Sequence, residues 1–322
     1  MRKWIVVLVI LLCASLVYAA GTTEAKKKLV FGGITFQEDQ FMRTVQLGMK
    51  AKAESLGIEM LMGNSDNKLE KEVELINTYI ERGVDAICVV PLSPDGSVPA
   101  LKRAADKKIT IVVANIGIKA DFQSTFIDSD NYALGSGTAK FAVDFIKKNL
   151  GGKAKIATLA FESQLKELSN MRQNGFEELI KKELPGSEIV VRQDAWLPEM
   201  GVRIAGDIMT AHPEVNVIWS ANEGGTVGAT MAVKNAGKAG KVFVFGTDAS
   251  EQLANFLLAE DNILQAVTGQ KPYTIGGILV DSAVKALKGE KLPKVIPVGG
   301  LTLQRGAPDE IRTYLKDPNK MQ

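Results

Sequence analysis

The chain alternates continuous apolar segments with segments in which apolar residues recur every three or four positions. In its first half the apolar segments are residues 29–34, 58–62, 84–90 and 109–114. Strands that are apolar along their whole length are buried on both faces, which is typical of a parallel sheet covered by helices on each side. The sequence therefore predicts an α/β fold with doubly wound parallel sheets.

After residues 124–127 the same alternation starts again, so the chain contains two similar halves. Further strands are expected at 154–159, 188–191, 215–220, 241–245 and 263–267, and helices are expected to begin near Asn131, Leu165, Pro198, Glu223 and Ser250. Gly57 and Gly83 follow two helical segments of the first half, where glycine commonly ends a helix. The 322 residues have room for two domains of ordinary size.

Residues 1–20 have the pattern of a secretory signal peptide. Arg2 and Lys3 precede an apolar segment at 4–12, which is short for a membrane span. The alternatives are a retained membrane anchor and lipid attachment at Cys13, although Leu12 is bulky for a lipid-attachment site. We expect export to the periplasm or cell envelope.

Loss of this segment removes Arg2 and Lys3 and no acid, so 39 bases become 37 against 37 acids. A net charge near zero argues against nucleic acid or an anionic membrane surface as the main partner. Cys13 would also leave, so Cys88 has no partner for an intramolecular disulfide. Because Cys88 lies in an apolar strand, we expect a buried thiol rather than a nucleophile.

Polar side chains follow two apolar strands of the second half: Asn222 follows one and Asp248 the other. In open α/β sheets, ligands bind at the carboxyl ends of the strands. With Trp196 and Gln270, these residues predict a site for a neutral, hydroxyl-rich small molecule, since amides and carboxylates bond hydroxyls and an indole covers C–H faces. The alternatives are helix caps for Asn222 and Asp248 (the latter ahead of Ser250), loop packing for Trp196 and a hinge contact for Gln270.

Five short segments, in this order, resemble the type I periplasmic sugar-binding proteins of the ribose-binding group. They are residues 81–87 (ERGVDAI), 128–131 (DSDN), 210–215 (TAHPEV), 246–248 (GTD) and 270–272 (QKP). The resemblance spans residues 29–303 and implies two lobes joined by three crossovers near Asp128, Gln270 and Gly300. The N-terminal lobe would hold residues 28–128 plus 271–300, and the C-terminal lobe residues 129–270 plus 301–322.

The resemblance also implies which residues contact the ligand. It puts polar contacts at Thr35 and Asp39 and an aromatic pair at Phe41 and Met42, although Met42 departs from that pattern. A hydrophobic staple at the helix start is the alternative for this pair. The full predicted set is Thr35, Asp39, Phe41, Met42, Asn115, Asn170, Trp196, Asn222, Asp248 and Gln270.

Two departures from the family pattern concern arginine. Residues 115–116 (Asn-Ile) stand where the family often has Asp-Arg, and Asn170 stands where it often has another arginine, with Arg172 close by. Because guanidinium groups make strong bidentate contacts, their loss indicates a ligand less densely hydrogen-bonded than ribopyranose. A modified sugar, a sugar alcohol or a furanose fits, and Asp39 and Asp248 without a nearby arginine would also permit a cationic group.

The implied function is a monomeric binding protein that closes around a sugar or polyol and docks on the membrane subunits of an ABC importer. We expect no cofactor, metal or catalysis, because the only histidine, His212, provides no His-based triad or His cluster. Residues 235–241 faintly resemble a phosphate loop but lead into a strand, which is the wrong order. Carboxylate-only catalysis, as in a glycosidase, is the remaining enzymatic alternative.

A ligand-sensing receptor is the second class of function. The closed form could dock on a chemoreceptor or sensor kinase. Residues 93–96 and 99–103 also resemble receptors for the furanosyl signal autoinducer-2, whose ligand-binding lysine has no counterpart around Ile34 or Thr35. A DNA-binding repressor is excluded, because a signal peptide takes the place of the DNA-binding head.

Overall fold

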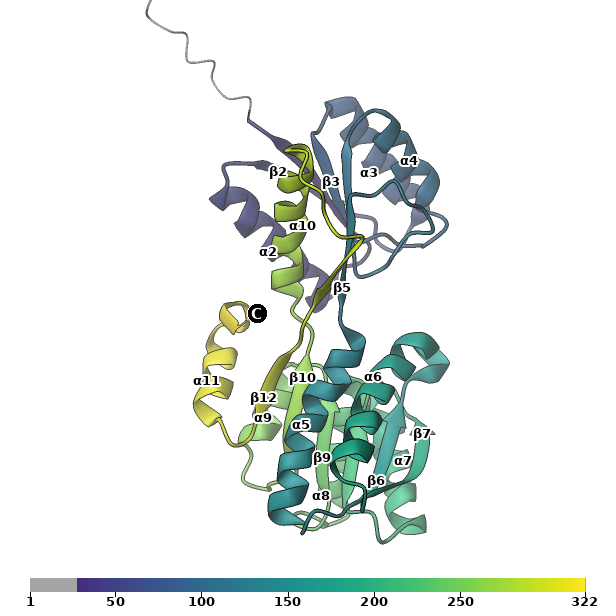
Figure 1. Ribbon diagram of the computed structural model, residues 1–322, viewed down its shortest axis with the longest axis vertical. Helices are drawn as coiled ribbons and strands as arrows, with labels where there is room; N and C mark the ends of the chain where they lie inside the picture. Colours follow the sequence, from purple (N-terminus) through teal and green to yellow (C-terminus); the bar gives the residue numbers. More distant parts are fainter. Residues whose placement is uncertain (1–27, 322) are drawn as a thin grey trace, which may run out of the picture.

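The computed structural model describes residues 28–321, and the predicted signal peptide lies outside them. The chain forms two α/β lobes placed end to end (Figure 1). The first, here called the N-lobe, contains β1 (Val30–Thr35), α2 (Gln40–Ser55), β2 (Glu59–Asn64), α3 (Leu69–Arg82), β3 (Ala86–Val89), α4 (Val98–Asp106), β4 (Thr110–Ala114), β5 (Thr125–Ser129), α10 (Pro272–Leu287) and β11 (Val295–Val298).

The second, here called the C-lobe, holds most of the remaining described chain. It contains α5 (Asn131–Asn149), β6 (Lys155–Ala160), α6 (Glu162–Glu183), β7 (Glu188–Asp194), α7 (Pro198–Ala211), β8 (Val217–Ser220), α8 (Glu223–Asn235), β9 (Phe243–Thr247), α9 (Glu251–Leu258), β10 (Leu264–Gly269), β12 (Leu301–Gln304), α11 (Pro308–Lys316) and η1 (Pro318–Met321).

Each lobe is built on one six-stranded sheet. The strand orders are β11-β5-β4-β3-β1-β2 and β12-β10-β9-β8-β6-β7, so the two lobes repeat one topology. The strands pair in parallel except for β12, which runs antiparallel to β10. Helices cover both faces of each sheet. The predicted fold class, two doubly wound parallel-sheet lobes joined by three crossovers, is confirmed.

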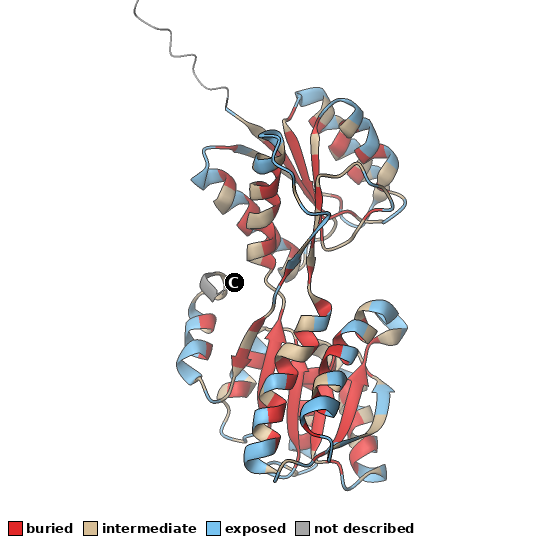
Figure 2. Ribbon diagram, viewed as in Figure 1, coloured by how far each residue is buried: buried red, intermediate tan, exposed pale blue. Residues whose placement is uncertain are grey.

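Alternate residues of the central strands enter different cores, which explains why these strands are apolar throughout. On β3, Ala86 and Cys88 pack beneath α2 and α10, whereas Ile87 and Val89 face α3 and α4. The central strands of both sheets are accordingly buried on both faces, whereas the edge strands β2, β7 and β11 are partly exposed (Figure 2). Burial raises the pKa of the Cys88 thiol to about 12. The expectation of a buried thiol is therefore confirmed, and the raised pKa disfavours the nucleophilic thiolate.

One predicted helix start is wrong. Helix α6 begins at Glu162 rather than Leu165, because the carboxylate of Asp194 accepts the backbone N–H groups of Glu162 at 2.6 Å and of Ser163 at 3.3 Å. Leu165 itself has non-helical dihedrals inside this helix. Asp194 ends the neighbouring strand β7, so local periodicity does not reveal the cap. Local periodicity also does not define α10, β11, β12 and α11.

The chain crosses between the lobes at residues 129–131, 269–272 and 298–301. Hydrogen bonds tie these crossovers to one another. Gln270 donates its Nε2 to Oγ of Ser129 at 2.7 Å, and the N–H of Asp130 donates to the carbonyl of Val298 at 3.0 Å. The segments run side by side between the lobes (Figure 1).

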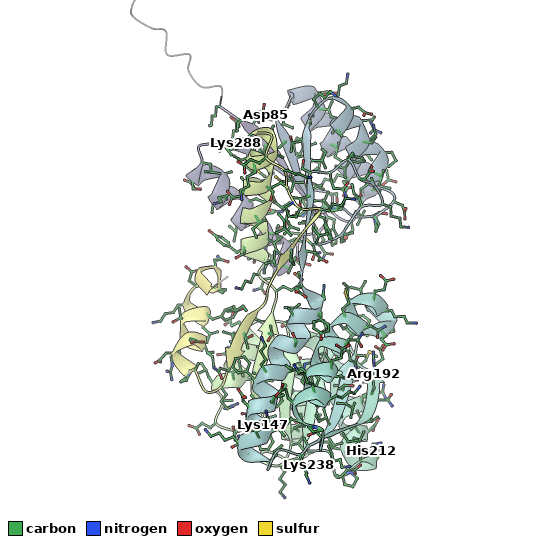
Figure 3. The ribbon with its side chains drawn as sticks, in the orientation of Figure 1. Asp85, Lys147, Arg192, His212, Lys238 and Lys288 are labelled. Carbon is green, nitrogen blue, oxygen red and sulfur yellow. The ribbon has the colours of Figure 1, made fainter. Side chains whose placement is uncertain are left out.

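The carboxyl edges of the two sheets face each other. Asp85 precedes β3 and Lys238 precedes β9, and the two residues lie at opposite far ends of the molecule (Figure 3). Because these residues mark the amino edges, residues that follow the strands point toward the other lobe.

Close helix contacts depend on glycine. A Cβ on Gly135 of α5 would lie 1.8 Å from the carbonyl oxygen of Arg172 on α6, and one on Gly175 would lie 2.1 Å from the carbonyl oxygen of Tyr132. The α5 and α6 backbones therefore touch directly, and no other residue type leaves room for this contact.

We predict that Gly135→Ala lowers the free energy of unfolding by about 2 kcal/mol or more, because the methyl group must separate α5 from α6. Gly206→Ala is the control: Gly206 is also inside a helix, but a Cβ there meets nothing within 4 Å. It should be neutral or stabilising by up to about 1 kcal/mol, since alanine favours helix. Urea unfolding measures both. Equal effects from the two variants would contradict the packing argument.

A second prediction concerns pH. Burial raises the pKa of Asp128 to about 6, with a smaller opposing hydrogen bond from the Ser129 backbone and a contribution from Asp130. The folded state therefore binds more protons than the unfolded state between about pH 4 and pH 6. This contribution to stability is present below pH 4 and is lost as the pH rises through 6.

Asp128→Asn should remove this dependence. Between pH 4 and pH 7.5 the stability of the wild type should fall relative to the variant by about 1 kcal/mol, a figure reduced for partial exposure. Urea unfolding at the two pH values tests this. A constant difference between the two proteins would show that Asp128 titrates normally.

Candidate functional site

Three predicted site residues come together on the C-lobe. Asn222 and Asp248 follow the adjacent strands β8 and β9, and Trp196 lies after β7. The Nδ2 of Asn222 donates to the carbonyl of Trp196 at 2.8 Å, and the N–H of Glu223 donates to Oδ2 of Asp248 at 3.0 Å. A carboxylate, an amide and the Trp196 backbone are thus held at one edge of the sheet, while the half-buried Trp196 side chain packs against the C-lobe core, as its alternative interpretation expected.

Arg172 of α6 is the residue that the prediction missed. Its Nη1 lies 3.3 Å from Oδ1 of Asp248 and donates to the carbonyl of Ala221 at 2.9 Å. The side chain of Arg172 is only 7% exposed, against 27% for Asp248. The expectation that Asp248 has no arginine nearby is therefore wrong. With its charge compensated, Asp248 is poorly suited to a cationic ligand.

The remaining bonds of Arg172 leave one donor free. Its Nε donates to Oδ1 of Asn131 at 3.0 Å, and the guanidinium lies 5.2 Å from the ring centre of Phe161. Within residues 28–321, Nη2 has no hydrogen-bond partner, and it is not among the fully buried unpaired atoms. This nitrogen reaches solvent next to Asp248, so a donor and an acceptor stand side by side.

The alternative role as a helix cap is correct for Asn222 but not for Asp248 at α9. Asn222 does cap α8, because its Oδ1 accepts the N–H of Gly225 at 3.1 Å. Asp248 does not cap α9: that role belongs to Ser250, whose side chain accepts from Leu253. Instead Asp248 has a left-handed backbone with φ of 73°, a strained conformation for a non-glycine residue. Its carboxylate is held beside Arg172 at the start of α8.

Two other predicted residues of this half lie elsewhere. Gln270 makes the crossover contact to Ser129, as its alternative interpretation expected. Asn170 accepts a hydrogen bond from Nη2 of Arg192 at 2.6 Å, and the same nitrogen contacts Glu162. Neither residue bonds to Asp248, and ligand contact by either one stays a prediction.

On the N-lobe, some predicted residues are accessible and others are not. Asp39 caps α2 by accepting the N–H of Met42 at 2.7 Å, and it also bonds Gln37. Thr35 is fully buried and accepts from Nε2 of Gln46 at 2.6 Å. Met42 is also buried, in the core beneath α2.

Among the predicted site residues of this lobe, the half-buried ones are Asp39, Phe41 and Asn115. Asn115 follows β4 with φ of 62°, and its N–H donates to the carbonyl of Ile127 at 2.9 Å. Within residues 28–321, no hydrogen bond or ion pair connects this N-lobe group with the C-lobe group. The predicted site is therefore divided between two facing edges.

A hollow of about 330 Å³ lies away from both groups. It is at the amino edge of the N-lobe sheet and is lined by Lys28, Lys50, Ala53, Glu54, Gly57, Ile58 and Met60. None of the predicted site residues contributes to it. Because ligands of open α/β sheets bind at the carboxyl edge, this hollow is not the candidate site.

Among residues 28–321 there is no group of three or more His, Cys, Asp or Glu side chains that could hold a metal ion. In the same range, no helix is long and apolar enough to cross a membrane. His212 ends α7, with Nδ1 3.4 Å from Oε1 of Glu214, at the far end of the C-lobe from the candidate site (Figure 3).

Residues 34–291 match a family model described as a periplasmic binding protein domain. The chain belongs to this family. It is 27% identical over 281 residues to the ABC transporter periplasmic-binding protein YphF of Escherichia coli, covering 84% of this chain and 85% of the relative. It is also 27% identical over 284 residues to the ribose import binding protein RbsB of Haemophilus influenzae, covering 87% and 92%.

The fold has solved counterparts. A periplasmic ribose ABC transporter protein from Conexibacter woesei superposes with a TM-score of 0.79 at 22% identity, covering 92% of this chain and 98% of that one. The resemblance to the ribose-binding group is confirmed. These relatives are binding proteins of ABC transporters rather than enzymes, which confirms on family grounds the prediction of a non-enzymatic role.

The Arg172–Asp248 pair gives a stability prediction. Asp248→Ala leaves a buried guanidinium without its carboxylate, so it should lower the free energy of unfolding by about 2–4 kcal/mol. Asp309→Ala is the control, because Asp309 pairs with Arg312 at 2.8 Å but has a 96% exposed side chain. Its effect should stay within about 0.5 kcal/mol. Similar losses in the two variants, measured by urea unfolding, would mean that burial does not strengthen the Asp248 pair.

Proposed function

We propose that this protein binds a neutral sugar or polyol between its lobes and, after export to the periplasm, delivers it to the membrane subunits of an ABC importer. The observation that carries the proposal is the Asp248 carboxylate beside the free Nη2 of Arg172, at an edge that faces the other lobe. The ribose import function named for a relative supports the ligand class.

The chemistry of this edge suits adjacent hydroxyl groups. Asp248 can accept from one hydroxyl while Arg172 donates to its neighbour, and charge-assisted bonds of this kind are strong. The Asn222 amide keeps a second N–H available beyond its two structural bonds. Because the carboxylate and guanidinium charges offset each other, the pair favours a neutral ligand over an ion.

Capture requires both lobes. Asp39, Phe41 and Asn115 would complete the site from the N-lobe when the lobes close. Contacts to both edges exist only in the closed form, so ligand shifts the equilibrium toward closure. We propose that the units 28–128 plus 271–300 and 129–270 plus 301–322 move about the three crossovers, and that the closed monomer docks on the importer.

The first experiment is a thermal-shift screen of the chain from Gly21 onward against pentoses, hexoses, polyols, furanosyl signals, nucleosides and small cations. A ligand that binds only the folded form raises the melting temperature. We expect a shift from a sugar or polyol. A shift from a nucleoside or cation alone, or no shift from protein shown to be folded and free of bound ligand, would overturn the proposed ligand class.

Tryptophan fluorescence then locates the ligand. Without residues 1–20 the chain keeps Trp196 and Trp219. Trp219 is fully buried and stacked on Phe176 with ring centres 4.6 Å apart, whereas Trp196 is half-buried at the proposed site. Ligand should change the emission of the wild type, and Trp196→Phe should abolish the change. A full change in that variant would mean that the ligand does not contact Trp196.

A further inference from the structure

Asn131 is not one of the predicted ligand-contacting residues, although it ends the 128–131 segment that carries the family resemblance. It is the first residue of α5, directly after the β5 crossover, and its side chain is buried. Its Nδ2 donates to the carbonyl of Ser129 at 3.0 Å, while its Oδ1 accepts from Nε of Arg172 at 3.0 Å. One amide thus connects the crossover with the guanidinium.

These bonds are part of a longer chain. Gln270 of the second crossover bonds the hydroxyl of Ser129, whose carbonyl bonds Asn131. Asn131 bonds Arg172, and Arg172 bonds Asp248. A continuous series of hydrogen bonds therefore runs from two crossovers to the acceptor and donor that face the N-lobe.

The packing of α5 against α6 keeps Asn131 and Arg172 within hydrogen-bonding distance. Gly135 lies one turn after Asn131, and its missing side chain lets the α6 backbone approach at Arg172. The same helix contact that brings the backbones together therefore brings the Arg172 side chain to Asn131.

We propose that Asn131 is a positioning residue for ligand binding, because it fixes the plane of the Arg172 guanidinium relative to the crossover. The proposal rests on the proposed function. Contacts to Nη1 from Ala221 and Asp248 hold one nitrogen but leave the plane free to tilt about it. A second anchor at Nε removes that freedom, so that Nη2 presents one direction to the ligand.

Asparagine meets both requirements of this position. It supplies an acceptor for Arg172 and a donor for the Ser129 carbonyl at once. Aspartate would keep the acceptor and lose the donor, and leucine would lose both at a similar volume.

The test uses NMR of protein labelled with ¹⁵N-arginine, and it requires no ligand. The Nε–H of Arg172, identified by its loss in Arg172→Lys, should exchange with solvent slowly in the wild type. In Asn131→Leu its exchange should be at least roughly tenfold faster, as expected for the loss of a hydrogen bond to a charged group. In Asn131→Asp exchange should stay slow, since the acceptor remains.

Thr138→Val is the control for general damage to α5. Thr138 is buried two turns further along this helix and bonds the carbonyl of Gly246 at 2.9 Å, outside the series. In Thr138→Val the Nε–H of Arg172 should exchange at the same rate as in the wild type. If Asn131→Leu does not fold, Asn131→Ala removes the same acceptor. Unchanged exchange in the Leu or Ala variant, or fast exchange in the wild type, would overturn the proposal.

Affinity for the sugar or polyol found in the screen gives the functional readout. Asn131→Leu should weaken binding by roughly tenfold, and Asn131→Asp should restore most of the affinity. Faster exchange at Nε–H with unchanged affinity would mean that Asn131 positions an arginine that the ligand does not use. Failure of every sugar and polyol to bind would overturn the proposed function, while the exchange rates would still decide whether Asn131 holds Arg172.

Discussion

Parallel strands place all their carboxyl ends at one edge. This constraint determines where the crossovers and the polar residues after the strands lie. Both sheets obey it, with only β12 reversed. The strands β5 and β10 end where the chain leaves one lobe for the other, so their carboxyl edges have to face each other. The polar residues that follow β4 therefore lie on one edge and those that follow β8 and β9 on the facing edge.

The buried guanidinium of Arg172 is the second constraint. A largely buried charge requires partners, and Arg172 obtains them from the start of α5, the segment after β8 and the loop after β9. The same bonds that satisfy Arg172 also hold the Asp248 carboxylate beside the start of α8. The atoms proposed to bind the ligand are therefore also atoms that stabilise the fold, and substitutions at Asp248 have to be measured for both.

Local sequence predicted the regular elements well where local forces decide them. Gly83 ends α3 in the left-handed conformation that glycine adopts easily, and Pro198 begins α7 as expected. The start of α6 was missed because its cap, Asp194, comes from the neighbouring strand. The spacing of apolar residues does not define helix α10, because this helix is largely apolar, packs against α2 and the sheet, and has no simple polar face.

Periodicity along the chain predicts the apolar strands, the amphipathic helices and their order, and hence two parallel sheets with polar residues after their strands. These features follow from local patterns and from the chemistry of single residues. The bonding partners of the polar groups depend instead on how distant elements pack. Arg172 meets Asn131, 41 positions away, and Asp248, 76 positions away, and no pattern within one helix or strand specifies such pairs. They form because glycine contacts and sheet order bring separate elements together, where a buried charge has to find its partners.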